Sequence, residues 1–168
     1  MILKDILIIR QPKTKDELKA MYDLRWRILR KPWNQPRGSE RDQYETKAIP
    51  YIALLGNEII GTARFHKINE SVGQIRYLAV EEGFRNQGVG SNILMTIHMT
   101  ALNRFVKYIL VNARINAVKF FEKHNYKIIE DGPLLFGEIK HKKMVLKFSK
   151  TELRLQKIIE SMRKVVKT

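Results

Sequence analysis

The stretch from Gln74 to Val106 decides the fold of this chain, and it reads QIRYLAVEEGFRNQGVGSNILMTIHMTALNRFV. Its first seven residues predict a β-strand, and residues 81–90 predict a tight loop that contains three glycines. After Gly88, apolar residues recur at four-residue steps, at Val89, Ile93, Ile97 and Ala101. This spacing predicts a helix with one buried face, so a glycine-bearing loop leads directly into the start of a helix.

The start of such a helix suits an anionic group. The first backbone N–H groups of a helix have no partner within the helix, and the helix dipole adds positive potential at the same place. Glycine at positions 88 and 90 allows a phosphate to approach the backbone closely. The loop therefore predicts a site for a phosphate-bearing ligand.

Two common phosphate-binding patterns do not fit this loop. A P-loop requires Lys and then Ser or Thr after its second glycine, and this chain has Val89 and Gly90 there. A dinucleotide fingerprint requires a third Gly or Ala at position 93, which is Ile93, and an acidic residue on the next strand, which residues 107–113 lack. The spacing supports neither a nucleoside triphosphate site nor a dinucleotide site.

Two segments resemble motifs of one enzyme superfamily. Residues 85–90, RNQGVG, resemble the Arg/Gln-x-x-Gly-x-Gly/Ala pyrophosphate loop of the GNAT (Gcn5-related) N-acetyltransferases. Residues 116–126, NAVKFFEKHNY, resemble that family's Asn-x-x-Ala-x-x-Leu-Tyr-Glu-Lys-x-Gly-Phe segment, compressed between Asn and Ala. The resemblance covers residues 51–148. It implies the GNAT fold, in which helices flank a mixed, mostly antiparallel central sheet.

The other segments fit this mixed α/β (α+β) fold. We expect strands at 2–10, 51–55, 58–66, 74–80, 107–113, 126–130 and 141–148, and helices at 15–31, after Gly88 and at 117–123. Thr14 is the expected N-cap of the first helix. Four cations follow toward the end of this helix, at Arg25, Arg27, Arg30 and Lys31. We expect them to complement the helix C-terminus, and phosphate binding is the alternative.

The chain extends beyond this fold at its C-terminus. We expect a GNAT domain at residues 1–150 and an added helix within 151–168, capped by Thr151, with apolar residues on one face and cations on the other. Such a helix can pack on its own subunit, pair with a second copy in a homodimer or face an anionic partner. The first two arrangements are favoured.

The composition bounds the class of protein. A chain of 168 residues with 44% hydrophobic residues suits one domain. It has no Cys and no apolar run near ~18 residues, so we expect no disulfide, no membrane partner and a soluble, cytoplasmic protein. Its four His form no His-x-x-x-His pair, so we expect no metal site.

The net charge of +15 raises other functions. A basic surface attracts nucleic acid or acidic proteins through long-range fields. Because Lys and Arg are spread along the chain with Asp and Glu between them, we favour a solvated surface and do not expect nucleic acid as a partner. The alternatives to an enzyme are a basic module that binds nucleic acid or protein and an acyl-CoA-binding protein without turnover.

The resemblance implies a site for acetyl-CoA as co-substrate. Backbone groups along Leu78, Ala79 and Val80 would pair with the pantetheine arm as an added strand. Asn116 would bond the cofactor arm, and Phe121 occupies the position of a family tyrosine that faces the cofactor. The pyrophosphate would lie on the loop and the first helical turn, at Arg85, Asn86, Gln87, Gly88, Val89, Gly90 and Ser91.

The implied reaction is direct attack of a primary amine on the thioester in a ternary complex, with a backbone N–H near Val80 steadying the oxyanion. This chain departs from the family twice, because the usual tyrosine acid is Phe121 and a glutamate base of some members is Gln74. The candidate replacements are His141, Tyr77, Tyr126 and Glu40. The acceptor-site candidates are Trp33 and Glu40, because they lie in the loop that shapes the acceptor pocket of the family. The alternative for Trp33 is that its side chain fills the core beneath the loop. The acceptor amine itself is not assigned by the sequence.

Overall fold

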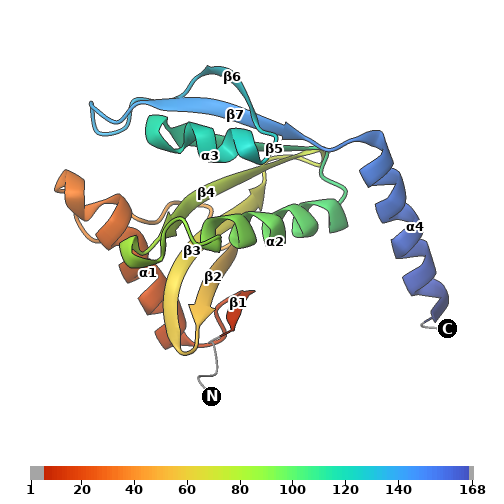
Figure 1. The fold of residues 1–168 in the computed structure, drawn as a ribbon, viewed down its shortest axis with the longest axis horizontal. Coiled ribbons are helices and arrows are strands. Elements are labelled where there is room, and N and C mark those ends of the chain that lie inside the picture. Colours follow the sequence, from red (N-terminus) through yellow and green to blue (C-terminus); the bar gives the residue numbers. More distant parts are fainter. Residues whose placement is uncertain (1–5, 167–168) are drawn as a thin grey trace. The chain divides into compact units, whose positions relative to one another are not determined.

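The computed structural model describes residues 6–166, which contain seven strands and four α-helices (Figure 1). The strands are β1 (Leu7–Arg10), β2 (Ile49–Leu55), β3 (Glu58–Lys67), β4 (Val72–Val80), β5 (Tyr108–Arg114), β6 (Lys127–Asp131) and β7 (His141–Lys147). The helices are α1 (Lys15–Leu29), α2 (Val89–Asn103), α3 (Val118–Lys123) and α4 (Lys150–Val166), with short 3-10 turns η1 (Lys31–Trp33), η2 (Glu82–Phe84) and η3 (Ile115–Ala117). The mixed α/β fold is confirmed. Residues 2–5 of the expected first strand lie outside the described range.

The strands form one sheet in the order β1-β2-β3-β4-β5-β7-β6. The pairs β1–β2, β2–β3, β5–β7 and β6–β7 are antiparallel. The expected two-residue turn joins β2 to β3, where Gly56 takes a φ of 59° that suits the tight hairpin. The mostly antiparallel sheet expected from the sequence is therefore present.

Internal contacts divide the chain into two compact units, each described separately below. The first unit comprises the residues up to His66 together with Ile75–Ile97. The second comprises Lys67–Gln74 and the residues from His98 onward, so it includes α4. This division differs from the domain boundary expected at residue 150, which stays a prediction.

In the first unit, α2 packs closely on β3 (Figure 1). A Cβ added at Gly61 would lie 3.0 Å from Ile93 Cδ1 and 3.2 Å from Val89 Cγ1, which is tighter than side chains normally pack. The glycine therefore lets the helix lie against the strand. The buried face of α2 matches the four-residue spacing of its sequence, with Ile93, Leu94 and Ile97 fully buried.

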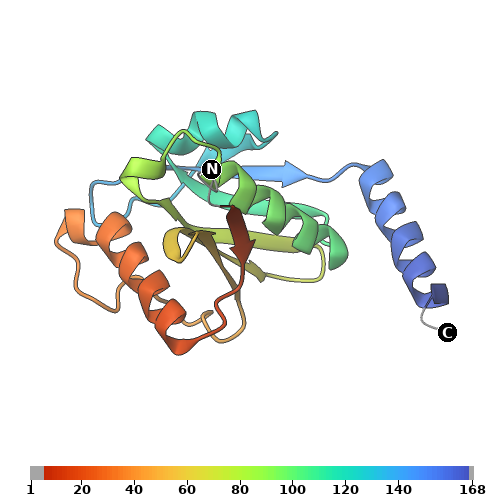
Figure 2. The ribbon, with the colours of Figure 1, turned by 60° about the horizontal axis from the view of Figure 1, so that its bottom comes forward.

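Helix α1 and the irregular segment 34–48 form the rest of the first unit, and Figure 2 shows this segment running back beside the helix. The N-cap prediction is confirmed, because the Thr14 hydroxyl accepts a hydrogen bond of 3.1 Å from Glu17 N. The segment is held by bonds from Trp26 Nε1 to Gln35 O at 3.0 Å and from Arg30 Nε to Ser39 O at 2.9 Å. It is an ordered loop, as the two prolines and the glycine indicate.

In the second unit, α4 follows β7. The prediction that Thr151 is the N-cap of this helix is wrong. Ser149 Oγ accepts from Glu152 N at 3.1 Å, and Glu152 Oε2 accepts from Ser149 N at 2.6 Å, which is a reciprocal capping box. Thr151 lies inside the first helical turn instead. Sequence reasoning missed the Ser-x-x-Glu spacing that marks this cap.

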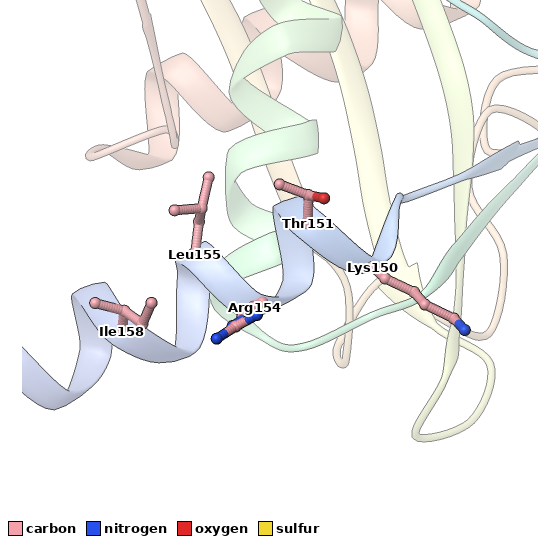
Figure 3. A pocket seen from close by; sticks show the side chains of 5 residues that line it. All are labelled: Lys150, Thr151, Arg154, Leu155 and Ile158. Carbon is pink, nitrogen blue, oxygen red and sulfur yellow. The ribbon is translucent and has the colours of Figure 1, made fainter.

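A bond of 2.7 Å from Gln156 Nε2 to Asn103 Oδ1 ties α4 to the end of α2. A hollow of about 420 Å³ lies on α4, lined by Lys150, Thr151, Arg154, Leu155 and Ile158 (Figure 3). None of these residues was a candidate site residue.

The packing of α2 yields a stability prediction. We expect Ile93→Ala to lower the free energy of unfolding by about 2–4 kcal/mol, because it empties a fully buried position. The control is Met95→Ala on the exposed side of the same helix, with an expected change below about 0.5 kcal/mol. Urea denaturation of the three proteins measures both values, and equal losses would contradict the packing of α2.

Candidate active site

Tyr77 has an unusual backbone conformation in the middle of β4. Its φ is 57°, in the left-handed region that side chains other than glycine rarely adopt. The strand continues past this residue through Leu78, Ala79 and Val80, and its alternation of buried and half-buried residues is kept. Backbone strain of this kind clusters at functional sites. The side chain of Tyr77 is buried.

Four guanidinium groups surround the ring of Tyr77, and we call them the arginine cluster. The distances from guanidinium carbon to ring centroid are 4.9 Å for Arg25, 5.0 Å for Arg64, 5.2 Å for Arg76 and 5.4 Å for Arg30. All lie within the ~6 Å at which a cation is attracted to an aromatic face. Arg25 and Arg64 are fully buried. The cluster joins α1, β3 and β4 of the first unit.

Two carboxylates from the 34–48 segment neutralise part of the cluster. Asp42 accepts from Arg64 at 2.6 and 3.0 Å and from Arg76 at 3.0 Å. Glu45 accepts from Arg25 at 3.1 and 3.2 Å and from Arg64 at 2.6 Å. Arg25 is therefore part of a buried ion-pair network, and the expectation that it complements the helix C-terminus is wrong.

Asp42 is a poor general base. Burial acts to raise the pKa of its carboxyl, but the hydrogen bonds from Arg64 and from the N–H of Tyr44 outweigh burial and hold the pKa at about 2. Tyr77 OH donates to Asp42 Oδ2 at 3.3 Å. Burial raises the pKa of Tyr77, and the charge of Arg76 opposes that rise, so the phenol is protonated at neutral pH and has a proton to give.

The two acceptor-site candidates of the loop are Glu40 and Trp33. Glu40 is buried, and its carboxylate accepts from Gly38 N at 2.7 Å and pairs with Arg41 at 3.5 Å. Trp33 ends the 3-10 turn η1 and is half-buried. Glu40 thus braces the loop beside the arginine cluster.

The predicted pyrophosphate loop lies at the surface of the first unit. Arg85, Asn86, Gln87 and Gly88 are exposed, and Asn86 and Gly88 take φ values of 58° and 84°. The bond from Asn92 N to Gly88 O at 3.0 Å is the first of α2, so the helix begins where the sequence predicts. Arg85 Nε donates to Val80 O at 3.1 Å and ties the loop to the end of β4. The accessible backbone of this helix start suits an anion.

The second unit holds the other motif. Asn116 lies in η3 with an exposed side chain, and Phe121 is buried in α3. The ring of Phe121 meets the rings of Phe120 and Tyr126 edge to face at 5.2 and 5.3 Å. Asn125 takes a φ of 65° where the family pattern has Gly, so this backbone position has the conformation that the pattern requires.

The His141 side chain is buried at the start of β7. Its Nδ1 lies 2.9 Å from Pro133 O and 3.0 Å from Ile139 O. Because both partners are carbonyls, Nδ1 carries a proton that it donates to them.

The half-buried His98 contacts the buried Tyr126 in the same unit, with 2.9 Å between Nε2 and the hydroxyl. Burial raises the pKa of Tyr126. Burial, and then the charge of His124, lower the pKa of His98 to about 4. Both groups are neutral at pH 7, and Tyr126 is a core residue of the second unit.

Over residues 6–166, no cluster of His, Asp and Glu could hold a metal ion. No helix in that range is long and apolar enough to cross a membrane.

Comparison with known proteins assigns the family. Residues 18–126, more than half of the chain, match the acetyltransferase (GNAT) family model. The chain belongs to this family. As a GNAT member it is an acetyltransferase, and acetyl-CoA is its co-substrate.

The chain is similar to several N-acetyltransferases and GNAT structures. The uncharacterized N-acetyltransferase YjcF of Bacillus subtilis is 25% identical over 133 residues, which are 79% of this chain and 94% of YjcF. A GNAT family acetyltransferase from Elizabethkingia anophelis, solved with acetyl-CoA bound, has a TM-score of 0.69 at 21% identity over 86% of this chain and all of its own. A GNAT acetyltransferase from Staphylococcus aureus Mu50 has a TM-score of 0.71 at 16% identity over the same shares.

The lowered pKa of the half-buried His98 predicts how stability depends on pH. Its pKa is lowered in the folded state, so the neutral ring stabilises the fold fully above pH 6.5, and this stability is lost as the pH falls from 6.5 to about 4. The loss amounts to about 3 kcal/mol at ~1.4 kcal/mol per pH unit. We expect His98→Gln to flatten the pH dependence of the unfolding free energy in that window. Urea titrations at pH 7, 5.5 and 4 check this, and parallel curves for both proteins would contradict it.

Proposed function

We propose that this GNAT enzyme transfers the acetyl group of acetyl-CoA to a primary amine by direct attack within a ternary complex. The observation that carries the proposal is the exposed loop ending at Gly88, which opens α2 with a positive φ and an accessible helix start. Acetyl-CoA is available in the cytoplasm, which is where the proposed reaction would occur.

The proposed cofactor contacts are mostly made by the backbone. The pyrophosphate would accept hydrogen bonds from N–H groups at Gly88 to Ser91, with Arg85 beside it. The pantetheine amides would pair with the backbone of Leu78, Ala79 and Val80, the last three residues of β4. Asn116 and Phe121 are assigned to the cofactor by their positions in the family motif.

The proposed chemistry needs little acid catalysis. The thiol of CoA has a solution pKa near ~8.5, so its thiolate can leave without being protonated. Orientation of the amine toward the thioester can therefore supply much of the rate enhancement. Tyr77 is the candidate acid, because its phenol is neutral and the surrounding guanidinium groups would stabilise the phenolate that forms. His141 is the candidate base for the ammonium proton.

The cofactor assignment is tested by Gly90→Glu. A carboxylate in the first turn of α2 would occupy the position proposed for the pyrophosphate and repel it, so we expect no measurable acetyl-CoA binding by calorimetry. Met95→Glu adds the same charge to the exposed side of α2 and is expected to bind like the wild type. Unchanged affinity in Gly90→Glu would refute the loop as the cofactor site.

The second test is Phe121→Tyr, which restores the hydroxyl of the family motif. General acid catalysis raises the rate by about 10²–10⁴-fold where proton transfer limits it. Because the thiolate can also leave unprotonated, we expect a phenol near the sulfur to raise kcat modestly, with little change in KM. Phe120→Tyr, in the adjacent position of α3, is the control and should leave kcat unchanged. Initial rates at saturating acetyl-CoA with one accepted amine decide between them. Equal rates in all three proteins would show that position 121 does not serve the thiolate.

A further inference from the structure

The arginine cluster has more positive charge than its carboxylates neutralise. Asp42 and Glu45 together receive the ion pairs of Arg25, Arg64 and Arg76. The guanidinium of Arg30 donates to the carbonyls of Ser39 and Leu29 and also interacts with Tyr77 and with the charge of Glu40. The third nearby carboxylate, Glu40, pairs with Arg41. This region therefore holds five guanidinium groups and three carboxylates, and the surplus is positive.

Of these five arginines, only two expose their guanidinium side chains to solvent. Arg25 and Arg64 are fully buried and Arg30 nearly so. The side chain of Arg76 is 39% exposed and that of Arg41 is 52% exposed. An arginine presents five N–H donors, and Arg76 directs Nη1 to Asp42. Its planar fork is suited to a carboxylate or a phosphate.

Arg76 also lies next to the proposed reaction centre along the chain. It immediately precedes Tyr77, and the proposed thioester segment begins at Leu78, two residues or roughly 7 Å further along the strand. A charge at this position acts on any acceptor that approaches the segment. The carboxylates do not reverse the sign of this field, because three of them stand against five guanidinium groups.

From this charge distribution we infer that the acceptor is an amine that also carries an anionic group, a carboxylate or a phosphate, which pairs with Arg76. The inference rests on the proposed function, because it concerns the acceptor of the same transfer. Arg76 is then the residue that determines acceptor specificity, with Arg41 adding to the positive field. A polycationic amine would bring like charge to the cluster and is disfavoured.

The test compares four short amines that differ in the group opposite the amine. These are β-alanine with a carboxylate, O-phosphoethanolamine with a phosphate, neutral 3-aminopropanol and dicationic 1,3-diaminopropane. Calorimetry on the CoA-saturated protein and on the CoA-free protein should give at least tenfold lower Kd for one or both anionic amines than for 3-aminopropanol, with 1,3-diaminopropane weakest. The two anionic arms separate a carboxylate acceptor from a phosphate acceptor.

Arg76→Gln should remove the tenfold preference while leaving the affinity for acetyl-CoA unchanged, because Asp42 keeps its bonds to Arg64 and the fold is retained. Arg37→Gln is the control, since Arg37 pairs with Asp23 outside the cluster and should keep the preference. Thermal melts of both variants check folding.

Three results would overturn the inference. The first is equal Kd values for anionic and neutral amines in the wild type. The second is an equal loss of the preference for anionic amines in Arg76→Gln and Arg37→Gln. The third is a loss of acetyl-CoA affinity in Arg76→Gln, which would assign Arg76 to the cofactor phosphates. Failure of the proposed function is distinguished by the acetyl-CoA titration of the wild type, which is measured independently of the amines.

Discussion

The backbone of Tyr77 is the constraint on which the site depends. A tyrosine with φ of 57° inside a strand costs roughly 1–3 kcal/mol and persists only where its surroundings fix it. Here the surroundings are four guanidinium groups around a buried ring, each contact worth about 0.5–2 kcal/mol. The cluster therefore offsets the strain, and Tyr77 directly precedes the residues to which we assign the thioester.

The same cluster gives the irregular 34–48 segment its order. Asp42 and Glu45 lie in a stretch with little regular structure, yet their carboxylates are fixed by Arg25 and Arg64. Removing one partner of such a buried pair leaves an uncompensated charge and is strongly destabilising. Acceptor recognition and the integrity of this unit are thus coupled, because the residue that faces solvent, Arg76, shares Asp42 with the buried Arg64.

The sequence predicts those features that depend on local chemistry. The Thr14 cap, the Gly56 turn and the start of α2 after Gly88 all follow from residue types at short spacing, and the structure confirms them. The arginine cluster was not predicted, because Arg25 meets a carboxylate 20 residues later and Arg64 meets one 22 residues earlier. The one available signal was Arg25 itself, a charged residue within the helix expected at 15–31. The roles of the cofactor and catalytic residues stay predictions.

The central claim is that β4 after Tyr77 and the start of α2 hold acetyl-CoA through their backbones. Amide hydrogen exchange, followed with and without saturating acetyl-CoA, tests it most directly, because the assigned contacts are N–H groups. The account predicts slower exchange at residues 78–80 and 88–91, with little change in the hairpin at Gly56. Saturated binding with unchanged exchange in both segments would contradict it.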